Sequence, residues 1–140
     1  MLSLLRRWLG AAPPADPGGA GERAAADWLR CRRGFLIVAR NWRNPRDRRE
    51  EIDLVARDGD VLVFIEVKTR AAEALVSGFH AVDRRKRRVL QRAIRAYLRG
   101  LPMKPVTFRL DVVEVESSAD RVGAVRHFEN VPLFSKYTRA

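Results

Sequence analysis

The stretch EIDLVARDGDVLVFIEVKTR, residues 51–70, decides the fold of this chain. Two runs of Ile, Leu, Val and Phe flank an Asp-Gly dipeptide, a pattern that predicts an antiparallel hairpin. Both strands also carry charged residues, at Asp53, Glu66 and Lys68. Burying a charge without a partner costs several kcal/mol, so these three residues need a shared reason to be there.

The turn predicts how the two strands pair. If Asp58-Gly59 forms the two-residue turn, Asp53 lies opposite Phe64. Side chains alternate between the two faces of a sheet, so Asp53, Glu66 and Lys68 point to the same side. The opposite side then receives Ile52, Leu54, Val63, Ile65 and Val67.

Two carboxylates beside an ammonium group favour a hydrolytic metal site. The carboxylates of Asp53 and Glu66 would repel each other, and a divalent cation removes that repulsion. Oxygen ligands favour Mg²⁺ or Mn²⁺, and Lys68 can stabilise a phosphorane-like transition state or orient an attacking water. This set suits phosphodiester hydrolysis. The structural alternative is an edge strand in which Lys68 merely pairs with Glu66.

Two further charges fall on the apolar faces of predicted helices. Glu22 is in line with Ala25, Ala26 and Leu29, and Lys86 is in line with Val82, Val89, Ala93 and Tyr97. Both are therefore expected to face the sheet and share the site. The alternatives are a first-turn acid that favours the helix dipole, for Glu22, and a snorkelling side chain, for Lys86.

Composition limits the chemistry and the partners. The chain has 140 residues, enough for one domain, and 28 Lys+Arg against 17 Asp+Glu leave a net charge of +11. Such an excess favours nucleic acid as a partner, and less often an anionic membrane. One cysteine, Cys31, excludes an intrachain disulfide, and two histidines, His80 and His127, argue against zinc.

The pattern along the chain predicts one α/β domain. We expect a flexible tail and Pro/Gly linker over 1–20, a domain over 21–134 and a short tail over 135–140. Within the domain the pattern predicts, in order, a helix over 21–34, a strand over 35–42, a basic loop over 43–50, the hairpin, a loop over 70–80, a helix over 81–100, and strands over 106–116 and 122–130. A crossover helix between strands implies a mixed sheet. No stretch has the pattern of a signal peptide or a membrane span, so we expect a cytoplasmic protein.

The hairpin and its surroundings resemble known families. Asp53 followed by Glu66-Val67-Lys68 resembles the D…ExK motif of PD-(D/E)XK nucleases, and the helix with Glu22 is similar to that of archaeal Holliday-junction resolvases. More closely, the chain resembles the YraN family of small bacterial proteins. The segments that match are GERAAADWL, ARNWR, EIDLVARDGDVLVFIEVKTR, KRRVLQRAIRAYL and FRLDVVEV, which lie between residue 21 and about residue 132.

The resemblance implies a restriction-endonuclease-like αβββαβ core with a mixed central sheet flanked by helices. It implies that Asp53 and Glu66 are metal ligands together with the carbonyl of Val67, and that Lys68 is the catalytic lysine. Glu22 would bind metal or water. Lys86 would be an accessory cation. The family usually has Gly before EIDL, where this chain has Glu50, a change beside the loop NPRDRR.

Two basic stretches are candidates for phosphate contacts. They supply Arg43, Arg46, Arg48, Arg49 and Arg70 near the hairpin, and Arg84, Arg85, Arg87 and Arg88 at the start of the second helix, with Arg92, Arg95 and Arg99 further along it. For the last two, a solvated helix face is an equal alternative. The prediction is a metal-dependent endonuclease that acts on DNA, with branched DNA a fitting substrate. A homodimer is expected if it cuts both strands. The alternative is a non-catalytic module that binds nucleic acid or a protein partner.

Overall fold

A computed structural model describes residues 19–71, 82–118 and 121–133. The helices and strands are, in chain order, α2 (Ala20–Arg33), β1 (Leu36–Asn44), β2 (Asp47–Asp58), β3 (Val61–Arg70), α4 (Arg84–Arg99), β4 (Thr107–Ser118) and β5 (Arg121–Phe128). This is the order that the sequence predicts. The expected N-terminal tail (except its last two residues), the C-terminal tail, and nearly all of the expected loop over 70–80 lie outside the described residues.

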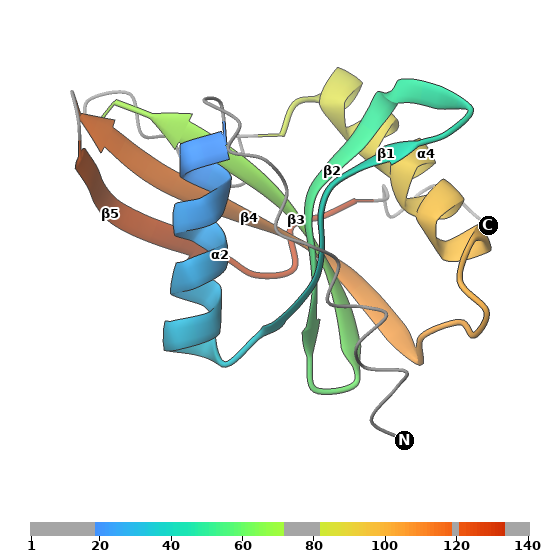
Figure 1. The fold of residues 1–140 in the computed structure, drawn as a ribbon. Helices are drawn as coiled ribbons and strands as arrows, with labels where there is room; N and C mark the ends of the chain where they lie inside the picture. The colour runs from blue at the N-terminus through green and yellow to red at the C-terminus, as the bar shows by residue number, and fades with distance from the viewer. Residues whose placement is uncertain (1–18, 72–81, 119–120, 134–140) are drawn as a thin grey trace.

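The strands form one five-stranded mixed sheet in the order β1-β2-β3-β4-β5. β3 and β4 run parallel, and the other neighbouring pairs are antiparallel. The two helices lie on opposite sides of the sheet, α2 against β3, β4 and β5, and α4 mainly against β2 (Figure 1). The α/β fold is therefore confirmed, and its mixed sheet between two helices is the one expected of a restriction-endonuclease-like core.

The first helix, α2, is held by small residues that allow close packing. It buries Ala25, Ala26 and Leu29 against the sheet. It ends where Gly34 takes a left-handed conformation with φ 67°, and Phe35 donates its N–H to the carbonyl of Leu29. Glycine favours this cap because it has no Cβ to strain the left-handed backbone.

The second helix, α4, begins with a side-chain cap. Asp83 precedes the helix, and its carboxylate accepts a 2.8 Å hydrogen bond from the N–H of Lys86. The helix buries Leu90, Ala93, Ile94 and Tyr97, at the spacing of one helical face. It ends at Gly100, as the sequence predicts.

The predicted basic loop over 43–50 is wrong, because most of it is strand. Only residues 45–46 form a turn, and β1 and β2 extend on either side of it. Polar pairs between the strands hold this hairpin together: Arg43 pairs with Glu51 at 2.8 Å, and the Asn44 amide donates to Glu50 at 2.8 Å. A polar composition indicated a loop, but cross-strand pairs of opposite charge also stabilise a sheet.

The predicted register of the β2–β3 hairpin is wrong by two residues. Asp58 pairs with Val61, so the turn residues are Gly59 and Asp60, and Leu54 lies opposite Ile65. Gly59 has φ 59°. With glycine first in the turn, no other residue needs a positive φ, whereas the predicted turn favours one at Asp58 as well. Because a shift of two residues keeps the side-chain alternation, the side chains within the ladder keep their predicted faces.

Two apolar clusters fill the two sides of the sheet. The cluster beneath α2 includes Leu54, Val63 and Ile65, with Val67 packed against it, as predicted. Ile52 was expected on that side, but it packs instead in the cluster beneath α4, with Phe64. The pairing of β2 with β3 ends at Leu54. Beyond this residue that pairing no longer determines which face a side chain of β2 takes.

Candidate active site

The candidate site lies where β2 and β3 separate. Their ladder ends at the pair of Leu54 and Ile65, and beyond it the two strands diverge (Figure 1). On the β1 side, Asn41 has φ 48° between two residues that pair regularly with β2. Asp53 is the next residue of β2, and its Oδ2 accepts a 2.8 Å hydrogen bond from the N–H of Val67. A side chain therefore replaces the backbone link between the strands at this point.

Glu66 is the most deeply buried acid of this site. Its side chain is 3% exposed, and its Oε1 lies 3.0 Å from Lys68 Nζ and 3.4 Å from Lys86 Nζ. Its other oxygen, Oε2, is buried and has no hydrogen-bond partner among the described residues. Leaving a buried carboxylate oxygen unpaired is costly, and such an atom calls for an explanation.

Lys86 reaches the sheet because of where α4 begins. Asp83 caps the helix, and Lys86 belongs to its first turn. This turn lies over the end of β3 that carries Glu66. The Lys86 ammonium therefore lies beside a carboxylate that is distant from it in the sequence. The side chains of Lys68 and Lys86 are partly exposed, at 24% and 28%.

The acids influence one another electrostatically. Burial, and then the nearby charge of Glu66, raise the pKa of Asp53 to about 7 from its ordinary 3.8, and the charge of Glu22 adds to the rise. The Val67 N–H and the charge of Lys86 act in the opposite direction. With a pKa of about 7, Asp53 is present near neutral pH in both its protonated and its ionised form.

The residues fit a divalent cation held by two carboxylates. The unpartnered Oε2 of Glu66 and the raised pKa of Asp53 are both features that a cation would relieve. The N–H and C=O of one strand residue point toward the same neighbouring strand, so the Val67 carbonyl faces the gap that contains Asp53. Oxygen ligands of this kind suit Mg²⁺ or Mn²⁺.

Glu22 does not join these two acids in one ligand set. Among the described residues, no group of three or more His, Cys, Asp or Glu side chains is placed to hold a metal ion. Glu22 is partly exposed in the first turn of α2, and its charge still acts on Asp53. It lies near the site as a source of negative charge.

The N-terminus of α2 approaches β3 through a glycine. A methyl group at Gly21 would collide with Oγ1 of Thr69, the residue after Lys68. Gly21 is buried and belongs to the first turn of α2. Only glycine allows this distance between the helix and the strand, and it places Glu22 beside the end of β3.

The arginines predicted to contact phosphates fall into three groups. Arg43 and Arg49 make ion pairs, with Glu51 and Asp47 respectively. Arg70 and Arg87 are partly buried, and each has a buried Nε without a partner among the described residues. The others are exposed: Arg46 and Arg48 in the β1–β2 hairpin, and Arg84, Arg85 and Arg88 in the first turns of α4.

Glu50, the residue before EIDL, has a structural role. It is buried, and its carboxylate binds Arg92 of α4 at 3.1 Å and the Asn44 amide at 2.8 Å. This contact joins the β1–β2 hairpin to α4. It also occupies Arg92, one of the arginines of the basic helix.

Glu114 is a buried acid that was not predicted from the sequence. It is fully buried on β4, directly beside Lys68 in the parallel ladder, and Arg126 of β5 lies 2.8 Å from its Oε2. Its Oε1 has no hydrogen-bond partner among the described residues. The signal in the sequence is a glutamate within the apolar strand segment DVVEV, the same type of signal that identified Glu66.

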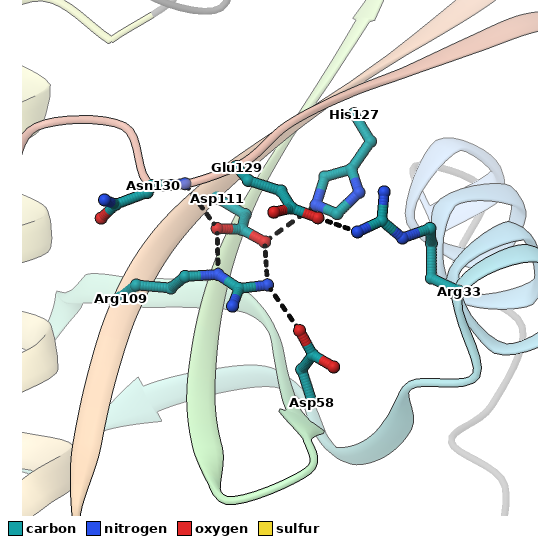
Figure 2. Close-up of polar contacts among 7 residues, drawn as sticks. All are labelled: Arg33, Asp58, Arg109, Asp111, His127, Glu129 and Asn130. Atoms are coloured by element: carbon teal, nitrogen blue, oxygen red, sulfur yellow. Dashed lines mark hydrogen bonds and ion pairs between the residues drawn. The ribbon is translucent and has the colours of Figure 1, made fainter.

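A second polar cluster, also not predicted from the sequence, lies on the α2 side of the sheet around the buried Asp111. Figure 2 shows its seven residues, which are Arg33, Asp58, Arg109, Asp111, His127, Glu129 and Asn130. Asp111 is fully buried and accepts from Arg109 Nε at 2.9 Å and from the Asn130 N–H at 2.9 Å, and it lies 2.8 Å from His127 Nε2. Arg109 also donates a hydrogen bond from Nη2 to Oδ2 of Asp58, at 3.0 Å.

This second cluster has the geometry of a structural network. Burial acts to raise the pKa of Asp111, but hydrogen bonds from His127, Arg109 and Asn130 outweigh it, and the pKa is lower than the ordinary 3.8. The His127 ring makes edge-on contacts with Trp28 and Phe35. The network joins the β2–β3 turn to the end of β5.

The mixed sheet between two helices, with Asp53, Glu66 and Lys68 gathered on one hairpin, defines an α/β chain of restriction-endonuclease-like type. A family model described as "Uncharacterised protein family UPF0102" matches residues 21–115. The chain belongs to this family, which is the YraN family that the sequence resembles.

Curated relatives agree with this assignment. The chain is 48% identical over 103 residues to a UPF0102 protein of Symbiobacterium thermophilum, an alignment that covers 74% of this chain and 84% of that protein. It is 38% identical over 116 residues to a UPF0102 protein of Prosthecochloris aestuarii, covering 83% and 88% of the two chains. It is 40% identical over 114 residues to one of Beutenbergia cavernae, covering 81% and 93%. Among the described residues, neither helix is long and apolar enough to span a bilayer.

Proposed function

We propose that this protein is a metal-dependent endonuclease that hydrolyses phosphodiester bonds in DNA. The observation that carries the proposal is the arrangement around Glu66. One buried oxygen binds two ammonium groups, from Lys68 and Lys86, while the other has no partner among the described residues. Asp53 lies close enough for the two carboxyl groups to affect each other's charge. Such perturbed groups gather at functional sites more often than elsewhere.

Asp53, Glu66 and the Val67 carbonyl would hold the cation. When bound, Mg²⁺ or Mn²⁺ supplies Lewis-acid polarisation of the scissile phosphate and lowers the pKa of bound water. The protein's part is to present its carboxylates as ions, which the raised pKa of Asp53 opposes in the absence of a cation. Binding of a cation should therefore release a proton from Asp53 near neutral pH.

The two lysines would act on the phosphate that reacts. In hydrolysis, water adds to phosphorus, the P–O bond to the leaving sugar oxygen breaks, and that oxygen takes up a proton. Negative charge increases on the phosphate oxygens as the water adds. Lys68 and Lys86 would stabilise that charge, because their side chains are partly exposed and their ammonium groups lie beside Glu66. Lys68 is also suited to orient the attacking water.

The first turn of α4 supports an anionic substrate. Residues 84–88 are all basic, and the first turn contains no acid. Positive charge at a helix N-terminus is unfavourable, because the helix dipole already places partial positive charge there. Bound phosphate groups would reverse that cost, since backbone N–H groups and arginines both favour anions at this position.

A cleavage assay tests the proposal. Purified protein is incubated with labelled linear, flapped and four-way DNA in Mg²⁺, in Mn²⁺ and in EDTA. We expect cleavage only with metal, and its loss in Glu66→Gln and Lys68→Ala. Arg32→Gln, an exposed control on α2, should keep its turnover. Equal cleavage by all variants would show a contaminating nuclease and contradict the proposal.

A second candidate is a non-catalytic module that binds nucleic acid or a protein partner. The observation that favours it is that Lys68 and Lys86 both bind Glu66, an arrangement that also satisfies a buried charge in a purely structural way. This candidate predicts binding that weakens with salt, and no turnover with any metal. It does not explain why Oε2 of Glu66 lacks a partner among the described residues.

A further inference from the structure

A hollow outside the candidate active site lies at the other end of α4. Its volume is about 300 Å³, and it lies between the last turns of α4, the connection to β4 and the first residues of β4. We call it the Phe108 pocket. Its lining residues are Arg95, Leu98, Arg99, Lys104, Pro105 and Phe108. A volume of about 300 Å³ lies at the lower end of the range for small-ligand sites.

The lining combines an aromatic ring with cations. Phe108 is 36% exposed, and its ring makes an edge-on contact with buried Phe64, with 5.9 Å between the ring centres. That contact holds the ring in place. Three cationic side chains surround it, and none of the lining residues is acidic. An accessible ring among cations is the combination that binds an unpaired base together with its phosphates.

The charge of the Phe108 pocket argues for a polyanion over a second copy of this chain. Two copies that meet face to face here would bring six cations together without an acid among the lining residues. Apolar residues are also exposed in the adjoining segment, with Met103 at 82% and Val106 at 92%. A nucleotide fits both the apolar surface and the positive charge. Its base can cover the apolar surface, and its phosphate can pair with the cationic side chains of the pocket.

The position of the Phe108 pocket relates it to the candidate active site. From Lys86 to Arg99, α4 rises about 20 Å. Along the sheet, Phe108 pairs with Leu62 of β3, which precedes Glu66 by about 13 Å of strand. Both separations can be spanned by several nucleotides, each of which rises about 3.4 Å in a B-form strand and more in an extended single strand.

We propose that the Phe108 pocket binds a base and phosphate of single-stranded nucleic acid, several nucleotides from the phosphate that is hydrolysed. This rests on the proposed nuclease function for its biological sense, but not for its test. An unpaired base is required because a base within a duplex has no free face to stack on Phe108. Substrates with a single-stranded arm, such as flaps, would then be preferred over plain duplex.

The test measures binding without metal. A fluorescently labelled single-stranded thymidine oligonucleotide is titrated with the full chain in EDTA, and its anisotropy is followed at several salt concentrations. Phe108→Leu should weaken binding by about tenfold, because it keeps the apolar volume and removes the stacking face. Phe108→Trp should bind at least as tightly as the wild type. The double variant Arg99→Gln/Lys104→Gln should lower the salt slope by about 1.4.

Matched controls separate the pocket from general charge and general apolar surface. Arg32→Gln removes an exposed cation from α2, and Leu36→Ala removes exposed apolar surface from β1. Both should leave affinity within about twofold, after thermal unfolding shows that each variant is folded. Equal affinity in Phe108→Leu and wild type, or no single-strand binding by wild type, overturns the pocket. If the protein binds single strands through Phe108 but never cleaves DNA with metal, the proposed nuclease function is contradicted and the proposed role of the Phe108 pocket is not.

Discussion

Lys86 Nζ of α4 lies 3.4 Å from Oε1 of Glu66, a carboxylate buried on β3. A second ammonium, that of Lys68, lies 3.0 Å from the same oxygen. Two cations on one oxygen leave the other oxygen of Glu66 for a ligand that the protein's described residues do not supply. When such a ligand neutralises Glu66, the ammonium groups of both lysines become able to stabilise the negative charge that develops on a phosphate.

Lys86→Met should therefore slow cleavage at saturating DNA by about 10²–10³-fold, the cost of removing one transition-state donor. Single-turnover rates with excess enzyme measure this. Arg88→Met, an exposed residue of the same helix, is the matched control and should change the DNA concentration needed for half-maximal rate while leaving the maximal rate intact. A Lys86→Met protein with a normal maximal rate would show that Lys86 only neutralises Glu66.

Asp53 should destabilise the metal-free fold at alkaline pH. Its pKa is about 7 in the folded protein and 3.8 ordinarily, so the folded state keeps a proton that the unfolded chain releases. The resulting cost is absent below pH 3.8, grows as pH rises and is complete above about 7. Asp53→Asn, which keeps an acceptor for the Val67 N–H, should stabilise the protein in EDTA by about 2–3 kcal/mol more at pH 8.5 than at pH 5. Urea denaturation at both pH values measures the difference, and an equal effect at both would contradict the raised pKa.

Gly21 and Thr69 should be coupled. Gly21→Ala forces α2 away from β3, which should cost about 1–3 kcal/mol of stability and displace the neighbouring Lys68. Thr69→Ala removes the oxygen that the new methyl group would meet, and alone it should have a small effect because Thr69 is exposed. The double variant should therefore recover most of the lost stability, as measured by chemical denaturation. Additive effects would mean that the collision is relieved in another way.

The faces of the hairpin could be predicted because alternation with period two is insensitive to an even shift. The turn begins at Gly59 where Asp58 was expected, yet Leu54, Val63 and Ile65 keep their predicted face, and Glu66 and Lys68 follow Phe64 on the other face. Lys86 could also be placed, since helical spacing aligns it with buried Ala93 and Tyr97. Its contact with Glu66 depends on the position of α4 over the sheet, which no local pattern encodes.

Other parts of the fold depend on contacts between distant residues. The turn at 45–46 is held by pairs such as Arg43 with Glu51, and polar composition alone indicated a loop. Glu114 lies beside Lys68 only because β3 and β4 are parallel neighbours in this register. Asp111 of β4 likewise contacts His127 only because β5 is the neighbouring strand. For these, the acid in an apolar strand is a visible signal, but its partner is set by the pairing of strands.

Asp111 should carry a large share of the stability on the α2 side. Replacing it with Asn removes the negative charge that pairs with Arg109 and one of the two acceptor oxygens of the cluster, which should cost about 3–5 kcal/mol. Because the pKa of Asp111 is lowered, its contribution is present above pH 3.8 and is lost as pH falls through the folded value. Guanidinium denaturation should therefore show that the free energies of unfolding of the wild type and of Asp111→Asn differ less at pH 3 than at neutral pH. Arg33→Gln, in the exposed pair with Glu129, is the control and should cost less than about 1 kcal/mol.

Manganese binding measured by calorimetry or electron paramagnetic resonance tests most directly whether Asp53 and Glu66 form one divalent cation site. We predict one Mn²⁺ per chain for the wild type at pH 7.5, with proton release on binding, and at least a tenfold loss of affinity in both Asp53→Asn and Glu66→Gln. Lys68→Ala should keep the ion, because it removes a positive neighbour and no ligand. Binding that is absent in the wild type, or unchanged in both carboxamide variants, would contradict the shared site and the hydrolytic function that depends on it.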